Sequence, residues 1–308
     1  MRYLLTAITF MAGLGLLLTA PATALAEMNV FACEPEWASL AEEVGGDLVE
    51  TFAATNASQD PHYIRARPSL IAKMRKADLV ICSGASLETG WLPVLFQKAG
   101  NAKVQPGGTG YLMAAEVVPV LEKPDAIDRS MGDVHPEGNP HVHLNPHNIL
   151  LMARELTKRL KTLDSSHADS YQARYEEFAA SWQQSIRRWE ASAAKLKGMR
   201  IITHHQSWSY LIGWLGLDLV NTLEPKPGIP PTTGHLESLL QQVRETPVLA
   251  IIRTPYASDK ASEWLSAKSG IPAVVLPYTI GGETGVTDLF ALFDRTINHL
   301  TELGDDKR

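Results

Sequence analysis

The sequence predicts an α/β protein of two lobes, each a parallel sheet flanked by helices, joined by a long rigid interdomain helix. Short apolar runs alternate with helical patterns near the start of the chain, and the same alternation resumes after Gly198. Between them lies a segment with helical periodicity and no Gly or Pro. Alternating strands and helices are typical of parallel sheets covered on both faces. We therefore expect an N-terminal lobe at 27–146, a helical linker at 147–197 and a C-terminal lobe at 198–308.

The elements of the first lobe follow from short apolar runs and the residues that interrupt them. Gly45-Gly46 ends the first helical pattern, and each apolar run is short enough for a buried strand. The predicted strands are 28–32, 48–53 and 78–81, and the predicted helices are 37–44, 68–76 and 91–99.

The linker begins at a clear helix start. Asn145 is a capping residue and Pro146 suits the first turn, and this helix is expected to run to about Leu163. In the segment that ends at Lys197, apolar side chains then recur at spacings of three and four, which indicates an amphipathic helix about 45 Å long. Such a helix can cross one domain and reach the next. Its apolar face consists of Tyr171, Tyr175, Phe178, Trp182, Ile186 and Trp189.

The second lobe repeats the rhythm of the first. Its predicted strands are 200–202, 218–223, 248–253 and 273–276, and its predicted helices are 207–214, 236–245, 258–269 and 287–303. In open parallel sheets, ligands bind beyond the carboxyl ends of the strands. Because two such lobes face each other, the cleft between them is the expected ligand site.

The chain begins with the features of a secretory signal. Arg2 precedes an apolar run, and Ala24-Leu25-Ala26 fits a cleavage site before Glu27, so we expect residues 1–26 to be a signal peptide and the mature protein to be periplasmic. A membrane anchor is the alternative, but the apolar run is short for a span. The formal net charge is −6, and loss of Arg2 makes it more negative. Nucleic acids and anionic membranes call for basic patches, so neither is an expected partner.

The two cysteines, Cys33 and Cys82, each follow a predicted strand. In an oxidising compartment an even pair suggests a disulfide, and neighbouring parallel strands would bring the two within bridging distance. Two buried thiols are the alternative. Lipid attachment at Cys33 is disfavoured, because this residue lies well beyond the apolar run.

Histidines at three places are candidates for a metal site. His62 follows a strand and a polar loop, His141 and His143 lie in a stretch bounded by prolines, and His204-His205 lies where a strand ends and a helix begins. Imidazole suits zinc, copper, nickel and iron, and three imidazoles on zinc leave a fourth position for a carboxylate or water. The pattern does not say which three converge. Three further histidines, each without a polar cluster around it, are not expected to bind metal: His167, His235 and His299.

Four motifs in order resemble the metal-binding solute receptors of ABC importers for zinc and manganese, the cluster A-I periplasmic binding proteins. The resemblance spans the chain essentially from end to end. In the third motif, Asn139 and Asn145 replace aspartates and His143 replaces a tryptophan. The motifs are Asp60-Pro61-His62 with Arg67-Pro68-Ser69; Ala77-Asp78-Leu79-Val80 through Gly84, Leu87-Glu88 and Trp91-Leu92; Asn139-Pro140-His141 through Asn145-Pro146; and His205-Gln206-Ser207-Trp208-Ser209-Tyr210.

The resemblance implies a metal site formed by His62, His141 and His205. A histidine at the third position goes with zinc in this family and a glutamate goes with manganese, so His205 favours Zn²⁺. The family's function implies a monomeric, non-enzymatic receptor whose zinc is transported cargo and whose partner is the ABC transporter membrane permease. Asp60 is expected to be a turn residue or a hydrogen-bond partner of an imidazole.

The fourth ligand position departs from the family pattern. Many members have an aspartate after the last strand, where this chain has Thr279 or Ile280. Water, Glu283 and Asp288 are the candidates for that position. Many zinc-binding members also carry a long His-rich loop before the second ligand, whereas this chain has a short one with His135, which either captures zinc transiently or lies in a solvated loop.

Two other functions are compatible with parts of the sequence. The order His141-x-His143-x-Asn145-x-His147 superficially resembles a motif of binuclear zinc hydrolases, although it lacks the Asp-His ending and Pro146 breaks the usual turn. An adhesin or a metal buffer without a transporter would share every feature of the receptor family.

Overall fold

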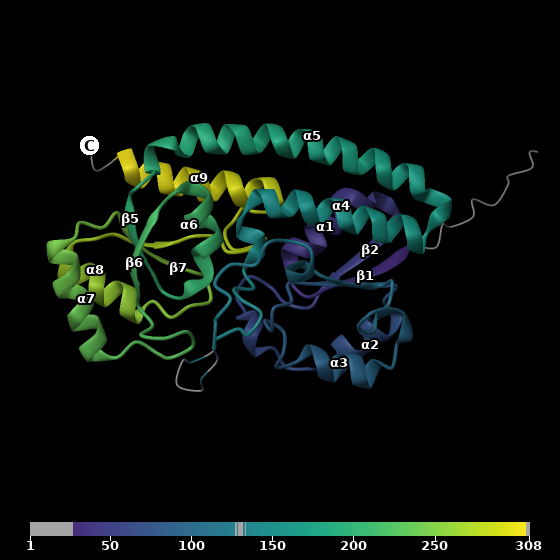
Figure 1. Cartoon of the computed structure of the whole chain (residues 1–308), viewed down its shortest axis with the longest axis horizontal. Coiled ribbons are helices and arrows are strands. Elements are labelled where there is room, and N and C mark those ends of the chain that lie inside the picture. Colours follow the sequence, from purple (N-terminus) through teal and green to yellow (C-terminus); the bar gives the residue numbers. More distant parts are fainter. Residues whose placement is uncertain (1–26, 127, 129–131, 133, 306–308) are drawn as a thin grey trace, which may run out of the picture.

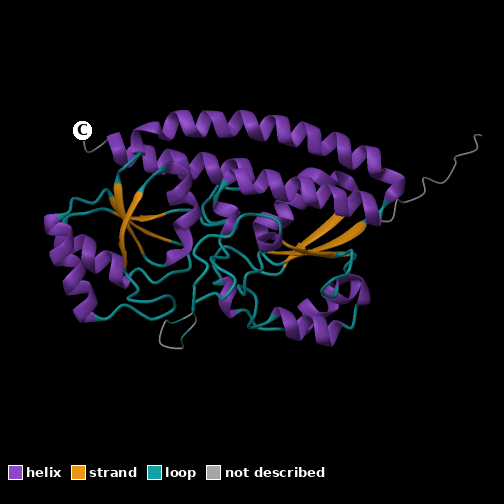
Figure 2. Ribbon diagram, viewed as in Figure 1, coloured by secondary structure: helices purple, strands orange, loops and turns teal. Residues whose placement is uncertain are grey.

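The computed structural model describes residues 27–126, 128, 132 and 134–305. The predicted signal peptide, 1–26, lies outside the described residues. Two four-stranded parallel sheets lie side by side, each covered by helices, and a long helix runs across both (Figures 1 and 2). The predicted fold class is confirmed.

The first sheet has the strand order β2-β1-β3-β4, so the chain crosses over between consecutive strands. Its strands are β1 (Met28–Ala32), β2 (Val49–Ala53), β3 (Leu79–Cys82) and β4 (Tyr111–Met113), and its helices are α1 (Pro35–Gly45), α2 (Pro68–Lys76) and α3 (Leu92–Ala99). The three-residue strand β4 was not predicted from the sequence, because so short a run carries no periodicity. It forms through its parallel pairing with β3.

The second sheet repeats this order as β6-β5-β7-β8. Its strands are β5 (Arg200–Thr203), β6 (Asp218–Thr222), β7 (Ala250–Arg253) and β8 (Ala273–Val275), and its helices are α6 (Ser209–Leu215), α7 (Thr233–Glu245), α8 (Lys260–Ser269) and α9 (Leu289–Asp305). In both sheets the pairing is parallel throughout. All strands of a sheet therefore end at the same edge, and the loops that follow them gather there.

The lobes share one hydrophobic core, to which the linker helices α4 (Pro146–Leu163) and α5 (Ala168–Ala193) contribute. Helix α5 runs over both lobes beside α4 and α9 (Figure 1). Trp182 is fully buried, and its ring contacts Phe290 and Phe293 of α9 at centroid distances of 4.8 and 5.4 Å. This continuous packing joins the two lobes. We call the helices α4, α5 and α9 the spine.

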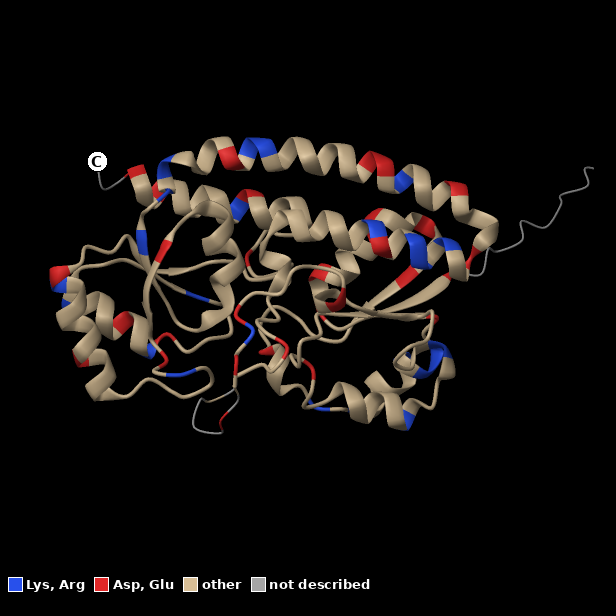
Figure 3. Cartoon of the chain, viewed as in Figure 1, with Lys and Arg blue, Asp and Glu red and all other residues tan. Residues whose placement is uncertain are grey.

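Charged residues of both signs are interspersed along α4 and α5 (Figure 3). This pattern is typical of a solvated helix face. Among the described residues, no helix has both the length and the apolar character that a membrane span requires.

Cys33 and Cys82 form a disulfide at the carboxyl ends of β1 and β3. The two strands pair in parallel, and the Cys33 amide donates to the Ile81 carbonyl at 2.9 Å. Both cysteines are fully buried. The predicted disulfide is present in the structure, so the alternative of two buried thiols does not apply.

Candidate metal centre

Three segments that are distant in sequence meet between the lobes, and each presents one histidine. His62 comes from the loop after β2, His141 from the segment before α4, and His205 from the turn after β5. His62 lies within a short 3₁₀ helix, and His141 and His205 each immediately precede one.

A short 3₁₀ helix over Pro61–Tyr63 presents His62. Asp60 caps this turn, because its carboxylate accepts a hydrogen bond from the His62 amide at 3.0 Å, and Pro61 preorganises the first position. The Trp91 indole donates to the Pro61 carbonyl at 2.9 Å. The Asp-Pro-His motif is therefore a capped turn anchored to the buried core of the N-terminal lobe.

The segment with His141 uses asparagines where the family pattern has aspartates. Asn139 accepts from the His141 amide at 3.0 Å, and Asn145 caps α4 by accepting from the His147 amide at 3.0 Å. An amide oxygen can accept these backbone hydrogen bonds as a carboxylate does, but it carries no charge. The two replacements preserve the turn geometry and remove two negative charges from this segment.

His205 ends the extension of β5 and begins the 3₁₀ helix over Gln206–Trp208. The Thr203 hydroxyl donates to the His205 carbonyl at 2.9 Å. The preceding residue, His204, still belongs to the sheet hydrogen bonding, because its amide donates to the Ile252 carbonyl at 2.8 Å. Adjacent side chains therefore diverge here, and His205, unlike His204, points toward His62 and His141.

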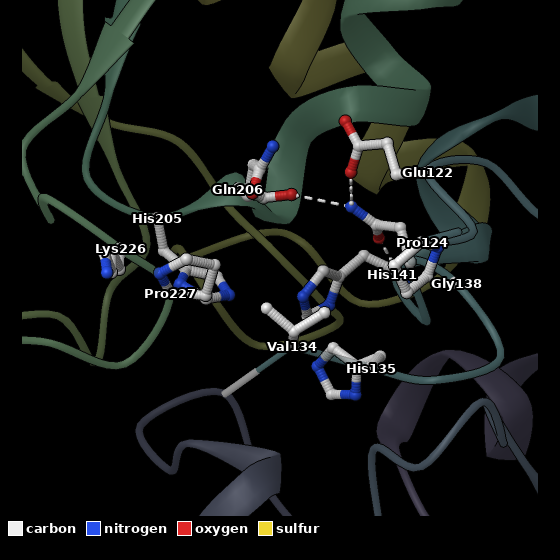
Figure 4. A pocket seen from close by; sticks show the side chains of 11 residues that line it. Glu122, Pro124, Val134, His135, Gly138, His141, His205, Gln206, Lys226 and Pro227 are labelled. Carbon is white, nitrogen blue, oxygen red and sulfur yellow. Dashed lines mark hydrogen bonds between the residues drawn. The ribbon is translucent and has the colours of Figure 1, made fainter. Parts of the chain in front are cut away.

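The three imidazoles form a nearly equilateral arrangement. The ring centroids are 5.6 Å apart for His62 and His141, 5.7 Å for His62 and His205, and 5.7 Å for His141 and His205. A cavity of about 360 Å³ opens beside them and is lined by His135, His141 and His205 (Figure 4). We call His62, His141, His205 and His135 the imidazole cluster.

His135 also belongs to the cluster. The sequence left open whether this residue captures zinc or lies in a solvated loop. Its Nε2 lies 3.2 Å from Nε2 of His62, and its ring centroid is 6.3 Å from that of His141. Ligand nitrogens of His62, His135 and His141 all lie within 4.8 Å of one another. These distances suit imidazoles that share one ion, which would draw the nitrogens to its coordination distance.

Each of the three expected ligands has an oxygen partner at Nδ1. Asp60 Oδ1 lies 2.7 Å from Nδ1 of His62, and Glu224 Oε2 lies 2.7 Å from Nδ1 of His205. The Tyr278 hydroxyl lies 2.6 Å from Nδ1 of His141. An ionised carboxylate only accepts, so His62 and His205 carry their protons on Nδ1 and leave Nε2 free to bind a metal.

Electrostatics favour a neutral His141, an ionised Asp60 and a neutral Tyr278. Burial, followed by the neighbouring histidines, holds the pKa of His141 well below its usual value. Burial would raise the pKa of Asp60, but hydrogen bonds and charge from His62 outweigh it and lower that pKa. Burial raises the pKa of the Tyr278 hydroxyl, so this group stays a neutral phenol. Nε2 of His141 is buried and has no hydrogen-bond partner among the described residues.

Two histidines next to the expected ligands face other partners. His143 lies behind the cluster, with Nε2 2.9 Å from the Tyr278 carbonyl and Nδ1 3.2 Å from Glu36. His204 points toward the other carboxylate oxygen of Glu224 at 3.9 Å. Residue-by-residue matching to the motifs selected the same member of each pair that points into the cluster.

The remaining histidines are bonded elsewhere. His147 pairs with Glu190 at 3.0 Å on the surface, so it does not join His141 and His143 in a binuclear site. The other three bind partners in their own neighbourhoods: His167 with Asp164, His235 with the Thr222 carbonyl and His299 with Glu283.

The acidic candidates for the fourth position have other contacts. Glu283 pairs with Arg295 at 3.2 Å and with His299 at 2.7 Å. Asp288 accepts from the Ala291 amide at 2.8 Å in the first turn of α9. The Thr279 hydroxyl donates to Glu36. Among the described residues, His135 forms a compact group with two of the expected ligands, His62 and His141.

Sequence reasoning missed two residues, Glu224 and Tyr278. Glu224 follows β6 in the loop at the sheet edge where ligands gather, so its position after a strand was an available signal. Tyr278 had no such signal, because an apolar-aromatic position in a loop does not indicate which histidine it reaches. Asp60, by contrast, was expected as an imidazole partner, and it lies in hydrogen-bonding distance of His62.

The chain is similar in sequence to substrate-binding lipoproteins of metal ABC transporters. Manganese ABC transporter substrate-binding lipoprotein PsaA of Streptococcus pneumoniae is 24% identical over 248 residues, covering 79% of this chain and 76% of the relative. Metal ABC transporter substrate-binding lipoprotein SloC of Streptococcus mutans is 21% identical over 266 residues, covering 85% and 84%.

The fold is similar to two groups of solved structures. A crystal structure of ZnuA superposes with a TM-score of 0.75 at 21% identity, covering 91% of this chain and 98% of that one. The cadmium-bound periplasmic metal-binding protein of Candidatus Liberibacter asiaticus superposes with a TM-score of 0.73 at 17% identity, covering 90% and 99%.

The two-lobed fold is that of these solved structures, and the relatives are substrate-binding lipoproteins of metal ABC transporters. The chain belongs to the ZnuA family, described as zinc-uptake complex component A, periplasmic, whose family model matches residues 30–303.

Proposed function

We propose that this protein is a periplasmic zinc receptor. It captures Zn²⁺ between its lobes, as a monomer and without catalysing a reaction, and delivers the ion to the permease of an ABC importer. Residues 1–26 direct export and are removed. His62, His141 and His205 are the ligands, and Zn²⁺ is cargo.

The observation that carries this proposal is the composition of the cluster, in which every converging side chain is an imidazole. Zinc accepts nitrogen ligands readily, whereas manganese sites favour oxygen. The relatives named for manganese leave the choice of metal open, and the description of the family supports zinc. The carboxylates Asp60 and Glu224 act on the imidazoles through Nδ1, so they compensate the charge of the ion without binding it.

We assign the fourth position to His135. Its Nε2 lies 3.2 Å from Nε2 of His62, and it reaches the cluster from a loop at the edge of the cavity. Four imidazoles complete a tetrahedral zinc site without water. Because the spine holds both lobes, metal exchange requires small movements of such loops rather than wide separation of the lobes.

Competition titration with a chromophoric chelator tests the proposal on the mature protein. We expect Zn²⁺ to bind far more tightly than Mn²⁺, and His62→Ala, His141→Ala and His205→Ala each to weaken zinc by more than the 10- to 100-fold that is typical for loss of an outer partner. His205→Glu should shift the preference toward Mn²⁺. Equal or tighter binding of Mn²⁺ by the native protein would contradict the proposal.

The fourth ligand is tested by three variants in the same assay. We expect His135→Ala to weaken zinc binding, and Glu283→Gln and Asp288→Asn to leave it unchanged, because both acids are bonded elsewhere. Loss of affinity in either acidic variant without loss in His135→Ala would overturn the assignment.

The function in the cell is tested by deletion of the gene and growth in zinc-depleted medium. If the protein is a receptor for import, the deletion should cause a growth defect that added zinc corrects. If the protein is an adhesin or a metal buffer, no such defect is expected. Zinc-dependent ester or lactam hydrolysis that is lost in His147→Ala would favour the hydrolase, a reading that the pairing of His147 with Glu190 does not support.

A further inference from the structure

The three oxygen partners of the expected ligands differ in one chemical respect. Asp60 and Glu224 are carboxylates, which accept hydrogen bonds when ionised and cannot donate. Tyr278 is a phenol, which can accept and can also donate. The protons of His62 and His205 are therefore fixed on Nδ1 with or without a metal, whereas the proton of His141 is not.

The Tyr278 hydroxyl has a fixed position. Its side chain is 2% exposed, and that of His141 is 1% exposed. The Tyr278 carbonyl lies 2.9 Å from Nε2 of His143, whose ring stands edge-on to the tyrosine ring at 4.8 Å. The next residue, Thr279, donates to Glu36 of α1. The phenol is thus held between the two lobes and has little freedom to turn away from His141.

Proton positions follow from this geometry. A metal on Nε2 of His141 requires the ring proton on Nδ1, and the Tyr278 oxygen is then the acceptor. Without metal, the buried hydroxyl has one hydrogen-bond partner among the described residues, which is Nδ1 of His141. The phenol O–H is a more acidic donor than an imidazole N–H, and the imidazole nitrogen is a better acceptor than the phenol oxygen, so the phenol donates to Nδ1. The ring proton then lies on Nε2, which has no hydrogen-bond partner among the described residues.

We propose that Tyr278 is a positioning residue for metal capture, whose hydrogen bond to His141 reverses direction when the ion binds. In the metal-free protein the phenol donates and His141 holds the Nε2–H tautomer. In the metal-bound protein His141 donates from Nδ1 and the phenol accepts. This inference rests on the proposed function, because it takes His141 as a ligand.

The hydrogen bond between Tyr278 and His141 links the orientation of a metal ligand to the position of one lobe relative to the other. Tyr278 lies between β8 and α9 of the C-terminal lobe, and His141 lies before α4. The metal polarises the imidazole and makes its N–H a stronger donor, so the hydrogen bond is strongest when zinc is bound. A movement that separates the two segments removes the acceptor from His141 and weakens the metal site.

Affinity measurements on four variants test the positioning role. We expect Tyr278→Phe to weaken zinc binding about 10- to 100-fold. Tyr171→Phe is the matched control, because it removes another buried tyrosine hydroxyl, one that bonds Asp164 rather than a histidine, and should leave affinity unchanged. In a His141→Ala background, Tyr278→Phe should have no further effect. A loss that persists in this background would mean a general structural role and would overturn the proposal.

Nitrogen NMR of ¹⁵N-histidine-labelled protein tests the reversal itself. We expect the His141 signals of the metal-free protein to report the Nε2–H tautomer and those of the zinc complex to report Nδ1–H with Nε2 bound. His62 and His205 should report Nδ1–H in both states. A metal-free His141 that already carries its proton on Nδ1 would overturn the reversal.

An error in the ligand set and an error in the role of Tyr278 give different results. If His141→Ala leaves zinc affinity unchanged, the proposed ligand set is wrong. If His141→Ala weakens binding and Tyr278→Phe does not, the ligand set stands and the role of Tyr278 is refuted.

Discussion

His205 donates from Nδ1 to Glu224 Oε2 at 2.7 Å, and the same oxygen accepts the Gly228 amide at 2.9 Å. The carboxylate is therefore held by the backbone while it orients the imidazole. Glu224→Gln removes the charge that stabilises the polarised Nδ1–H of a metal-bound ring, so we expect zinc affinity to fall about 10- to 100-fold.

Glu283→Gln is the matched control for that prediction, because Glu283 also pairs with a histidine, His299, but outside the imidazole cluster. Chelator competition measures both variants. Unchanged affinity in Glu224→Gln would mean that His205 is oriented by the backbone alone.

The spine contributes stability through Trp182. This side chain is fully buried, contacts Phe290 and Phe293 of α9, and donates to the Pro146 carbonyl at 2.8 Å. Trp182→Ala removes these contacts and leaves a cavity, so we expect the free energy of unfolding to fall by about 3–5 kcal/mol. Urea denaturation measures the change, and Val94→Ala, at a position 41% exposed, is the control with little expected effect. A change below about 1 kcal/mol for Trp182→Ala would show that the site repacks.

The disulfide crosslinks a loop with a sequence separation of 49 residues. Because a crosslink restricts the unfolded chain, we expect Cys33→Ala with Cys82→Ala to lower the free energy of unfolding by about 2–4 kcal/mol. Neither cysteine belongs to the imidazole cluster, so zinc affinity should be retained. Reduced native protein should match the double variant in urea denaturation, and a large loss of zinc affinity in either would contradict this separation of roles.

The raised pKa of Glu88 should make the free energy of unfolding depend on pH. Burial outweighs the hydrogen bonds from the Ser83 and Gly84 amides and raises the pKa of Glu88 to about 7. An acid whose pKa is raised by folding contributes stability below its unfolded value, near 4.5, and this contribution is lost as the pH rises through about 7.

Glu88→Gln removes this titration. Relative to the native protein, the variant should therefore gain stability as the pH rises from about 4.5 to above 7, by an amount on the order of 3 kcal/mol. Urea denaturation across this range measures the difference, with the exposed Glu116→Gln as the control. A difference that is constant with pH would show that folding does not raise the pKa of Glu88.

Much of the fold could be predicted because its signals are local. The apolar runs of β1, β3, β5 and β7 are buried strands, the Asn145-Pro146 pair starts α4, and spacings of three and four define α5. Each signal depends on residues within one or two turns, where backbone sterics and capping act directly. Strand β4 was missed because its three residues form a strand only when β3 pairs with them.

In the candidate site, too, some features follow from local sequence and others from tertiary packing. The sequence by itself determined which segments carry the chemistry, since Asp60-Pro61-His62 caps its own turn and His205 stands at a strand end. Only the tertiary structure decided which groups face those imidazoles. Glu224 reaches His205 across 19 residues, and Tyr278 reaches His141 across 137. No local pattern encodes such pairs, because the packing of whole lobes brings their atoms together, and that packing also brings His135 to the metal site and turns His143 away from it.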